Sequence, residues 1–498
     1  MTAASVPRPR KRVVIAGGGT AGWLAATALV RQLAGLVEVT LLESDEIGTV
    51  GVGESTIPTI RTFHQFIGVE EDAFIRATNA TFKLGISFEH WDRIDARYFH
   101  AFGSVGRSTF VADFQHFWLE ARARGFGGAY GDYSLELQAA AATRFSLGRD
   151  PTLAYAYHLD STAYARFLRG IAEPAGVKRV EGRIATVERD GESGAIATLV
   201  LASGARIDGD FFIDCTGFRA LLIEDSLKTG FEDWSHWLPT DRAFAVQSET
   251  PEGLLPYTRA IAHGEGWRWK IPLQHRTGNG LVYSSAHLSD DVARDRLLAG
   301  IDGKPLFEPR QIRFTSGMRR RVWNHNCLSL GLASGFVEPL ESTSIHLVMI
   351  AVTWLVQNFP FGDDSAALAE RFNARTRREW EQVRDFIILH YVLTERDDTP
   401  FWQSRRTLPI PDSLAGRIAL FRESAMAYQD KDELFRIESW VEVMLGQGVT
   451  PRSHHRLPAT MPTAQLQGAM NDLRNGIATA VERLPGYETF LARFRQPA

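Results

Sequence analysis

The sequence predicts an α/β (α+β) fold: a Rossmann-like dinucleotide-binding module with mixed sheets, joined in one compact unit to a largely helical C-terminal module. Three observations support this. A β-branched run leads into a glycine turn near the N-terminus, strand-like runs alternate with polar turns in the middle, and helical periodicity dominates from about Ser365 onward. We place the two modules at residues 1–360 and 361–498, with an approximate boundary.

The N-terminal unit reads as strand, turn and helix. RVVIA at residues 12–16 precedes GGGTAG at residues 17–22, and WLAATALVRQLAG follows with the composition of a helix. A second strand, VEVTLLE, ends at Glu43, which lies 26 positions after Gly17. This is close to the spacing of the acid that accepts a ribose hydroxyl in dinucleotide-binding proteins. Residues 12–43 therefore predict a dinucleotide site, with a purely structural turn as the alternative.

The later segments predict further strands and helices. GARIDGDFFIDCTGF predicts strand structure that ends in a glycine turn, which is either a second cofactor-facing loop or only the end of a buried strand. SAALAERFNARTRREWEQVRDFIILHYVL and KDELFRIESWVEVMLGQG predict long helical stretches in the C-terminal third.

The composition of the chain argues against several classes of binding partner. The chain is 44% hydrophobic and 23% charged with a formal net charge of -4, so neither nucleic acid nor an anionic membrane is expected to bind it. No apolar stretch is long enough to span a membrane. The two cysteines, Cys215 and Cys327, are predicted to be buried thiols in a reducing compartment, and no metal site is expected. We interpret MTAASVPRPRKR as a solvated lead-in and expect a cytoplasmic protein.

Six motifs in order resemble those of the flavin-dependent tryptophan halogenase family. They are GGGTAGW, GVGESTIP, TFKLGI, FIDCTGF, GWRWKIP and GFVEPLESTSI, and together they cover most of the chain. Trp267 and Trp269, with Ile271 and Pro272, match the W-x-W-x-I-P signature that separates these enzymes from ordinary flavin monooxygenases. HYVLTERDDTPFW, residues 390–402, is similar to the family's helix-to-loop segment.

The resemblance implies an enzyme in which FAD, as FADH2, uses oxygen to oxidise chloride or bromide to hypohalous acid. It makes residues 1–360 an FAD-binding module with interleaved substrate-site segments, and residues 361–498 a mainly helical substrate module. The positions that it assigns to FAD are Gly17, Gly19, Thr20, Ala21, Gly22, Glu43, Ser55, Leu332, Ser342 and Ile345.

Lys83, in TFKLGI, matches the family's essential lysine, which hydrogen-bonds hypohalous acid or becomes a haloamine. Arginine is not expected to replace it, because a guanidinium stays protonated whereas a desolvated amine can lose its proton. Without the family, a surface lysine at the end of a strand or helix is the simpler interpretation. The apolar neighbours Phe82, Leu84 and Ile86 weaken that alternative.

Glu341, in PLEST, matches the carboxylate that stabilises or deprotonates the cationic ring intermediate. The alternative is an acid in the first turn of the helix STSIHLVMIAVTWL, where it would favour the helix dipole. The resemblance assigns halide to the backbone amides at Thr343 and Ser344, and makes Ser342 a bridge toward the flavin. The family usually has glycine at the position of Ser344, so the effect on halide preference stays open.

The resemblance also assigns residues to the substrate-binding site. Trp267 and Trp269 lie on one face of a strand by alternation and would form a wall between flavin and substrate, with core packing as the alternative. His100 and Phe102, in YFHAFG, match a histidine and an aromatic residue that sandwich the substrate ring. A capped or surface histidine is the alternative for His100.

The C-terminal segment departs from the tryptophan-specific pattern. AMAYQDKDELFRIESW has Tyr428 without the expected tyrosine neighbour, and Glu438 and Ser439 where a Phe-Trp step is expected. We therefore expect indole-like compounds without the amino-acid group to be accepted at least as well as tryptophan, with another free aromatic or a larger natural product as the alternatives. An aromatic hydroxylase and a non-catalytic flavoprotein are the competing functions.

No second nucleotide fingerprint, as an NADH site would need, surrounds Gly217 or Gly331. We therefore expect a separate NAD(P)H-dependent flavin reductase to supply the reduced flavin. The expected substrate is a small aromatic molecule. The sequence leaves the oligomeric state open, a homodimer included.

Overall fold

The computed structural model describes residues 10–46, 53–148, 150–250, 253–362 and 364–495. Within them, six strands form one sheet in the order β20-β21-β12-β1-β2-β8, parallel except for β20. Their bounds are β1 Lys11–Ala16, β2 Val37–Glu43, β8 Lys178–Glu181, β12 Phe211–Asp214, β20 Trp323–Asn324 and β21 Cys327–Ser329. Because the carboxyl ends of parallel strands meet at one edge, the segments that follow β1, β2, β12 and β21 come together there.

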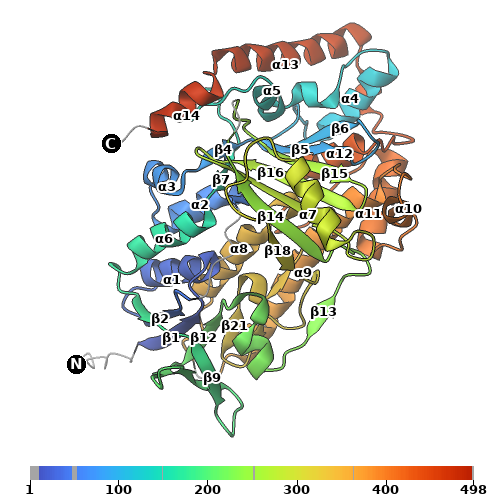
Figure 1. The fold of residues 1–498 in the computed structure, drawn as a ribbon. Coiled ribbons are helices and arrows are strands. Elements are labelled where there is room, and N and C mark those ends of the chain that lie inside the picture. The colour runs from blue at the N-terminus through green and yellow to red at the C-terminus, as the bar shows by residue number, and fades with distance from the viewer. Residues whose placement is uncertain (1–9, 47–52, 149, 251–252, 363, 496–498) are drawn as a thin grey trace, which may run out of the picture.

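The predicted N-terminal unit is confirmed. The strand β1 is buried along its second half, the glycine turn follows it, and α1 spans Thr20–Gln32. Helices α1 and α6 (Ser161–Ala172) pack against each other, and Figure 1 shows α1 between α6 and the strands β1 and β2. GARIDGDFFIDCTGF forms two strands, β11 (Arg206–Asp208) and β12, as predicted.

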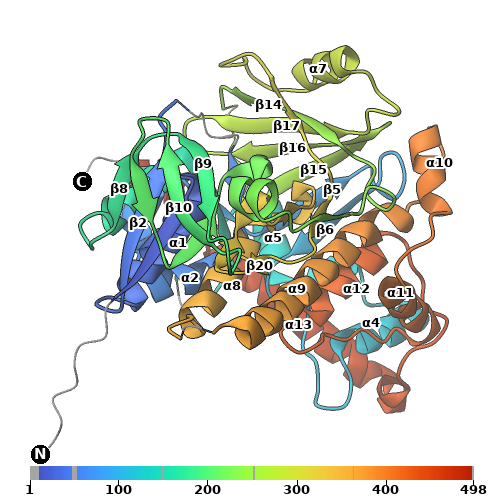
Figure 2. The same cartoon turned by 90° about the horizontal axis from the view of Figure 1, so that it is seen from below.

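A second large sheet carries the predicted tryptophan strand. Seven strands of the described chain pair in the order β18-β14-β17-β16-β15-β5-β6, antiparallel except between β15 and β5. Their bounds are β5 Gly85–Glu89, β6 Arg97–Ala101, β14 Arg242–Ser248, β15 Thr258–His263, β16 Gly266–Pro272, β17 Thr277–Tyr283 and β18 Arg310–Arg313. Helix α8 (Ser344–Gln357) passes between this sheet and the parallel one (Figures 1 and 2).

The described residues also form three smaller sheets of three strands each. The sheet nearest the site pairs β7 (Ala156–Leu159) with both β3 (Glu54–Ser55) and β4 (Thr81–Lys83). The remaining strands are β9 Ile184–Arg189, β10 Ile196–Leu201, β13 Phe231–Asp233, β19 Gly317–Arg319 and β22 Gly335–Phe336. One buried apolar core runs from α1 through α8 to the C-terminal helices, which agrees with a single compact unit.

The C-terminal third is helical, as predicted. Its helices are α9 Ala366–Val392, α10 Pro400–Arg406, α11 Asp412–Ser424, α12 Ile437–Gly446, α13 Thr463–Arg483 and α14 Tyr487–Arg495. The remaining helices are α2 Thr59–Ile67, α3 Glu71–Thr78, α4 Phe114–Ala123, α5 Leu135–Ala141 and α7 Asp290–Ala299. Helix α13 crosses α4 and α5 at the end of the molecule far from β1 (Figure 1). The module boundary near residue 360 stays a prediction.

The helix predicted from KDELFRIESWVEVMLGQG is wrong in its first third, because α12 begins only at Ile437. Glu433 explains the difference. Its buried carboxylate accepts the backbone N–H of Asp430 and pairs with Arg417, so local polar contacts replace a helical turn.

Candidate active site

A cavity of about 590 Å³ opens at the carboxyl edge of the parallel sheet, beside α8 and the tryptophan strand β16. It is large enough for a cofactor of nucleotide size. Of the predicted residues, its lining includes Gly17, Gly19, Thr20, Ala21, Glu43, Ser55, Trp267, Trp269, Leu332, Ser342, Ser344 and Ile345. The segment after β12, from Cys215 to Arg219, also lines it, so the second glycine turn is a cavity-facing loop.

The glycines of the first turn have different tasks. A Cβ atom on Gly17 would lie 2.2 Å from the carbonyl oxygen of Cys215, and one on Gly22 would lie 1.9 Å from that of Gly17. Both positions require glycine for close backbone packing, and Gly22 lies behind the turn rather than in the cavity lining. A Cβ atom on Gly19 would meet nothing within 4 Å, although Gly19 lines the cavity. This open cradle at the N-terminus of α1 fits a pyrophosphate.

Glu43 ends β2 at the cavity, where the ribose-binding acid is predicted. Its carboxylate accepts the indole N–H of Trp23 at 3.2 Å and pairs with Arg179. A Cβ atom on Gly18 would lie 1.6 Å from Oε2 of Glu43, so the turn and the acid fit closely together. These contacts fix the carboxylate of Glu43 at the edge of the cavity.

Trp267 and Trp269 form one wall of the cavity. They alternate along β16, both are buried, and their ring centroids are 6.0 Å apart. Neither indole N–H makes a well-aligned hydrogen bond among the described residues, although that of Trp267 lies within reach of the Glu338 side chain. Gly280 lies opposite Trp269 on β17, and a Cβ atom there would lie 2.0 Å from the indole ring. Both rings belong to the buried core and also line the cavity, so their role as a wall between flavin and substrate stays a prediction.

Lys83 is fully buried at the end of β4, so the surface-lysine alternative is wrong. Its Nζ atom donates to the carbonyl oxygen of Thr56 at 3.1 Å and to Oγ of Ser342 at 3.0 Å. Burial lowers the pKa of Lys83 to about 7, although Glu341 acts in the opposite direction. Because Ser342 also lines the cavity, it connects the lysine to the proposed cofactor space.

Glu341 ends a short 3-10 turn, Pro339–Glu341, immediately before α8. The alternative that placed it in the first turn of the long helix is therefore wrong. Its buried carboxylate lies 3.0 Å from Nδ1 of His100 and 2.8 Å from Nε2 of His390. Burial alone would raise the pKa of Glu341, but the two histidines lower it to about 2.

The predicted aromatic residues lie on one face of β6 and its continuation. Tyr98, His100 and Phe102 alternate along the chain, so their side chains share a face. His100 is buried and contacts Glu341, which excludes the surface-histidine alternative. Phe102 places its ring centroid 5.1 Å from Nζ of Lys83. One strand thus aligns the groups that the resemblance assigns to substrate.

Helix α8 begins at Ser344 with Thr343 as its N-cap residue, and the side chain of Thr343 makes no capping hydrogen bond. Ser344 lines the cavity, whereas Thr343 does not, and the hydroxyl of Thr343 has no hydrogen-bond partner in the described parts of the chain. Uncapped amides at the end of a long helix suit a small anion.

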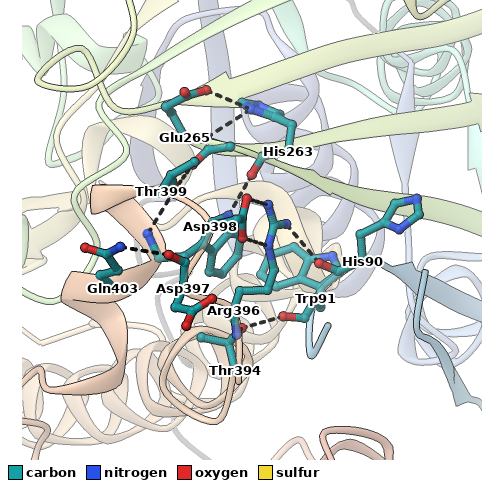
Figure 3. A network of polar contacts seen from close by, with 12 residues as sticks. His90, Trp91, His263, Glu265, Thr394, Arg396, Asp397, Asp398, Thr399 and Gln403 are labelled. Carbon is teal, nitrogen blue, oxygen red and sulfur yellow. Dashed lines mark hydrogen bonds and ion pairs between the residues drawn. The ribbon is translucent and has the colours of Figure 1, made fainter. Parts of the chain in front are cut away.

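The segment that follows α9 supports the wall formed by Trp267 and Trp269 through its contacts with Trp91. Figure 3 shows Arg396 paired with Asp398 and donating to the carbonyl oxygen of His90, while Thr394 donates to that of Trp91 at 2.7 Å. The ring centroids of Trp91 and Trp267 are 6.3 Å apart. The network therefore fixes Trp91 against the wall.

Sequence reasoning missed several residues of this centre. Thr56 accepts from Lys83, His390 contacts Glu341, and Glu338 accepts hydrogen bonds from Thr240 and Tyr391 while buried next to the wall. Glu338 stands in the same motif as Glu341, and His390 opens the recognised segment HYVLTERDDTPFW, so both motifs contained the signal.

Both cysteines are free thiols, and Cys327 is buried as predicted, but the prediction of burial is wrong for Cys215, which is half-buried because it lines the cavity. Burial raises the pKa of both thiols. No helix in the described ranges is long and apolar enough to cross a membrane, and those same residues contain no cluster suited to hold a metal ion.

The glycine cradle at a parallel sheet, next to a buried lysine and a buried carboxylate, defines a dinucleotide-dependent enzyme. Residues 12–463 match the family model for tryptophan halogenase. The chain is 35% identical to tryptophan 7-halogenase RebH of Lentzea aerocolonigenes over 96% of this chain and 98% of that protein.

Solved structures agree with this family. A flavin-dependent halogenase from Xanthomonas campestris is 50% identical with a TM-score of 0.96, covering 98% of this chain and 99% of the other. BrvH, a flavin-dependent halogenase from Brevundimonas sp. BAL3, is 42% identical with a TM-score of 0.94, covering 98% of this chain and 100% of the other. The chain belongs to the tryptophan halogenase family and is a flavin-dependent halogenase, an oxidoreductase that needs reduced flavin.

Proposed function

We propose that this halogenase uses FADH2, oxygen and chloride or bromide to form hypohalous acid, which Lys83 receives for electrophilic halogenation of an indole-like or other electron-rich aromatic. The observation that carries the proposal is the lysine itself. Lys83 is fully buried, its pKa is lowered to about 7, and Ser342 connects its Nζ atom to the cavity lining.

A lysine in this state offers a neutral amine at neutral pH. Its lone pair can accept a hydrogen bond from hypohalous acid or attack the halogen to give a haloamine. Arginine has neither option because its guanidinium stays protonated. Lys83→Arg is therefore expected to lose halogenation while it keeps a positive charge at this position.

Bound FAD would supply the oxidation of halide by oxygen. Gly17, Gly19 and Thr20 would hold its pyrophosphate at the N-terminus of α1, with Glu43 at the ribose. Ala21, Gly22, Ser55, Leu332, Ser342 and Ile345 would complete the contacts or the packing around them. Trp267 and Trp269 would separate this space from the substrate and keep water away from the oxidant.

The amides at Thr343 and Ser344 would bind the halide, because they lie uncapped at the start of α8. Ser344 lines the cavity, so its side chain would shape the halide site where the family usually has glycine. We expect this residue to influence the preference between chloride and bromide.

The substrate ring would lie beside His100 and Phe102, with the carboxylate of Glu341 stabilising the cationic ring. Tryptophan is the named substrate of the relative RebH, but the recognition segment differs here. Tyr428 packs under the guanidinium of Arg417, 4.1 Å from its ring centroid, and is thereby held in a structural contact. We therefore propose indole-like substrates without an amino-acid head group, and a separate NAD(P)H-dependent flavin reductase as the source of reduced flavin.

The test is a substrate panel with product identification. Purified protein, a flavin reductase, NADH, FAD and either halide are mixed with indole, tryptophan, pyrroles and phenols, and products are analysed by mass spectrometry. We expect halogen isotope patterns, with indole turned over at least as fast as tryptophan. Lys83→Ala and Lys83→Arg should abolish the halogenated product, whereas the exposed Lys178→Ala should not. Oxygen addition that persists in Lys83→Ala would instead identify an aromatic hydroxylase.

A further inference from the structure

Two histidines hold Glu341, and they differ in what their second ring nitrogen does. His100 approaches both carboxylate oxygens through Nδ1, at 3.0 and 3.2 Å. An ionised carboxylate only accepts hydrogen bonds, so Nδ1 carries the proton. With the single proton of the imidazole on Nδ1, the lone pair lies on Nε2, and within the described residues no hydrogen bond to Nε2 is formed.

The tautomer of His390 is fixed by its neighbours. The side-chain amide of Gln447 donates to the backbone carbonyl of His390 at 2.6 Å and to the hydroxyl of Tyr98 at 3.2 Å. The proton of Tyr98 is then free to bond Nδ1 of His390, 2.7 Å away. His390 must therefore carry its proton on Nε2, which faces Glu341 at 2.8 Å in a close but poorly aligned contact. Both ring nitrogens of His390 are committed.

Glu341 is a better counterion than proton acceptor in this setting. Its side chain is 2% exposed, and both oxygens face histidine N–H groups. These groups keep the carboxylate ionised and its pKa near 2, which makes it a weak base. The same arrangement orients His100, as a carboxylate does for the histidine of a catalytic pair.

The position of His100 suits a proton acceptor. Tyr98 and Phe102 flank it on the same face of the strand, one toward His390 and the other 5.1 Å from Nζ of Lys83. The rings of Phe386 and Phe435 lie 5.5 and 6.3 Å from the imidazole and exclude water from its surroundings. Phe102 thus contacts Lys83 and follows His100 by two positions along the chain, so a ring held against Phe102 would lie near both groups.

We infer that Nε2 of His100, rather than Glu341, accepts the proton that leaves the halogenated ring carbon. Glu341 then stabilises the imidazolium, and His390, Tyr98 and Gln447 are positioning residues. This inference rests on the proposed function.

The step balances as follows. The halogen of hypohalous acid bonds to the ring carbon and its oxygen leaves as hydroxide. The C–H bond then breaks, its electron pair returns to the ring, and the proton passes to Nε2. That proton finally converts hydroxide to water, so the arene and hypohalous acid yield the haloarene and water.

Ring-deuterated and ordinary indole, supplied together, test the inference. In the wild type we expect no discrimination between them, because formation of the carbon–halogen bond limits the rate. His100→Phe keeps an aromatic ring but removes the acceptor, so product formation should fall on the order of 10²-fold and deuterated indole should react more slowly. His100→Gly should show the same defect, and added imidazole should restore the rate and remove the discrimination.

Glu341→Gln is the matched variant, because it keeps the shape of the side chain and removes its charge. It should be slower but show less discrimination than His100→Phe. Strong discrimination in Glu341→Gln with none in His100→Phe and no rescue by imidazole would overturn the inference. If the wild type still gives halogenated product in that case, only the role of His100 is rejected and the proposed function is retained. If no wild-type reaction gives halogenated product, the proposed function itself is rejected.

Discussion

Replacing Lys83 with methionine should change how the stability of the protein depends on pH. In the folded protein the pKa of Lys83 is lowered from 10.5 to about 7 by burial. Between these values the unfolded chain binds more protons than the folded one, so the free energy of unfolding of the wild type rises with pH. Methionine has a similar volume and does not titrate, so the variant lacks this contribution.

The magnitude follows from the proton count. Each pH unit within the window adds about 1.4 kcal/mol, and the lysine is only about half protonated at pH 7, so the gain from pH 7 to pH 9 is about 2 kcal/mol. The unfolding free energy of the wild type minus that of Lys83→Met should therefore increase by this amount. At pH 7 the variant should unfold at a urea concentration close to or above that of the wild type, because the burial penalty of the ammonium is absent.

Urea unfolding at pH 7, 8 and 9 and constant ionic strength, followed by tryptophan fluorescence, measures the difference. Lys178→Met, at an exposed position of β8, is the matched control and should follow the wild type at each pH. A constant difference between wild type and Lys83→Met across this range would mean that the lysine stays charged when folded. That result would refute the argument for a neutral, nucleophilic amine.

Three further predictions concern the cavity. Gly22→Ala should lower the free energy of unfolding by about 1–3 kcal/mol because its Cβ atom meets backbone. Gly19→Ala should leave unfolding of the flavin-free protein unchanged but weaken flavin binding about tenfold, as measured by fluorescence titration. An unchanged flavin affinity in Gly19→Ala would contradict the assignment of this turn to the pyrophosphate. Ser342 has a φ of 60°, so Ser342→Ala should be about 1 kcal/mol less stable than Ser342→Gly in thermal unfolding, although both lose the hydroxyl. Gly280→Ala should push Trp269 into the cavity and lower flavin occupancy in the absorption spectrum; an unchanged spectrum would refute the close contact.

The local parts of the fold were predictable from the sequence. The unit from β1 to β2 follows from a β-branched run, obligatory glycines and a terminal acid, all within residues 12–43. The pairing of β5 with β15 was not predictable, because it joins residues 86–89 to residues 258–261 and depends on the packing of the whole core. KDELF was predicted as helix from its composition, but the buried contacts of Glu433 determine another structure.

Residues of the site could be predicted from the sequence where a single local motif contains them, but the contacts between motifs could not. Lys83 and the tryptophan pair stand in recognisable segments, and the structure adds their burial. The contact of His100 with Glu341 spans 241 positions, and that of Tyr98 with His390 spans 292. No local pattern encodes such contacts, since they depend on how β6, α8 and α9 pack together.

In the proposed mechanism, the four consecutive residues from Glu341 to Ser344 contribute to both the cofactor side and the substrate side of the site. Glu341 contacts His100, Ser342 joins Lys83 to the cavity, Thr343 begins α8 and Ser344 lines the cavity. Ser342 adopts a left-handed backbone conformation between the 3-10 turn and α8, and of the two flanking residues Ser344 lines the cavity whereas Glu341 does not. A change at Ser344 should therefore act on halide selection without moving Glu341, whereas a change at Ser342 should disturb both sides. Under the proposed assignments, the halide preference and the ring chemistry can therefore vary separately, although only two residues lie between Glu341 and Ser344.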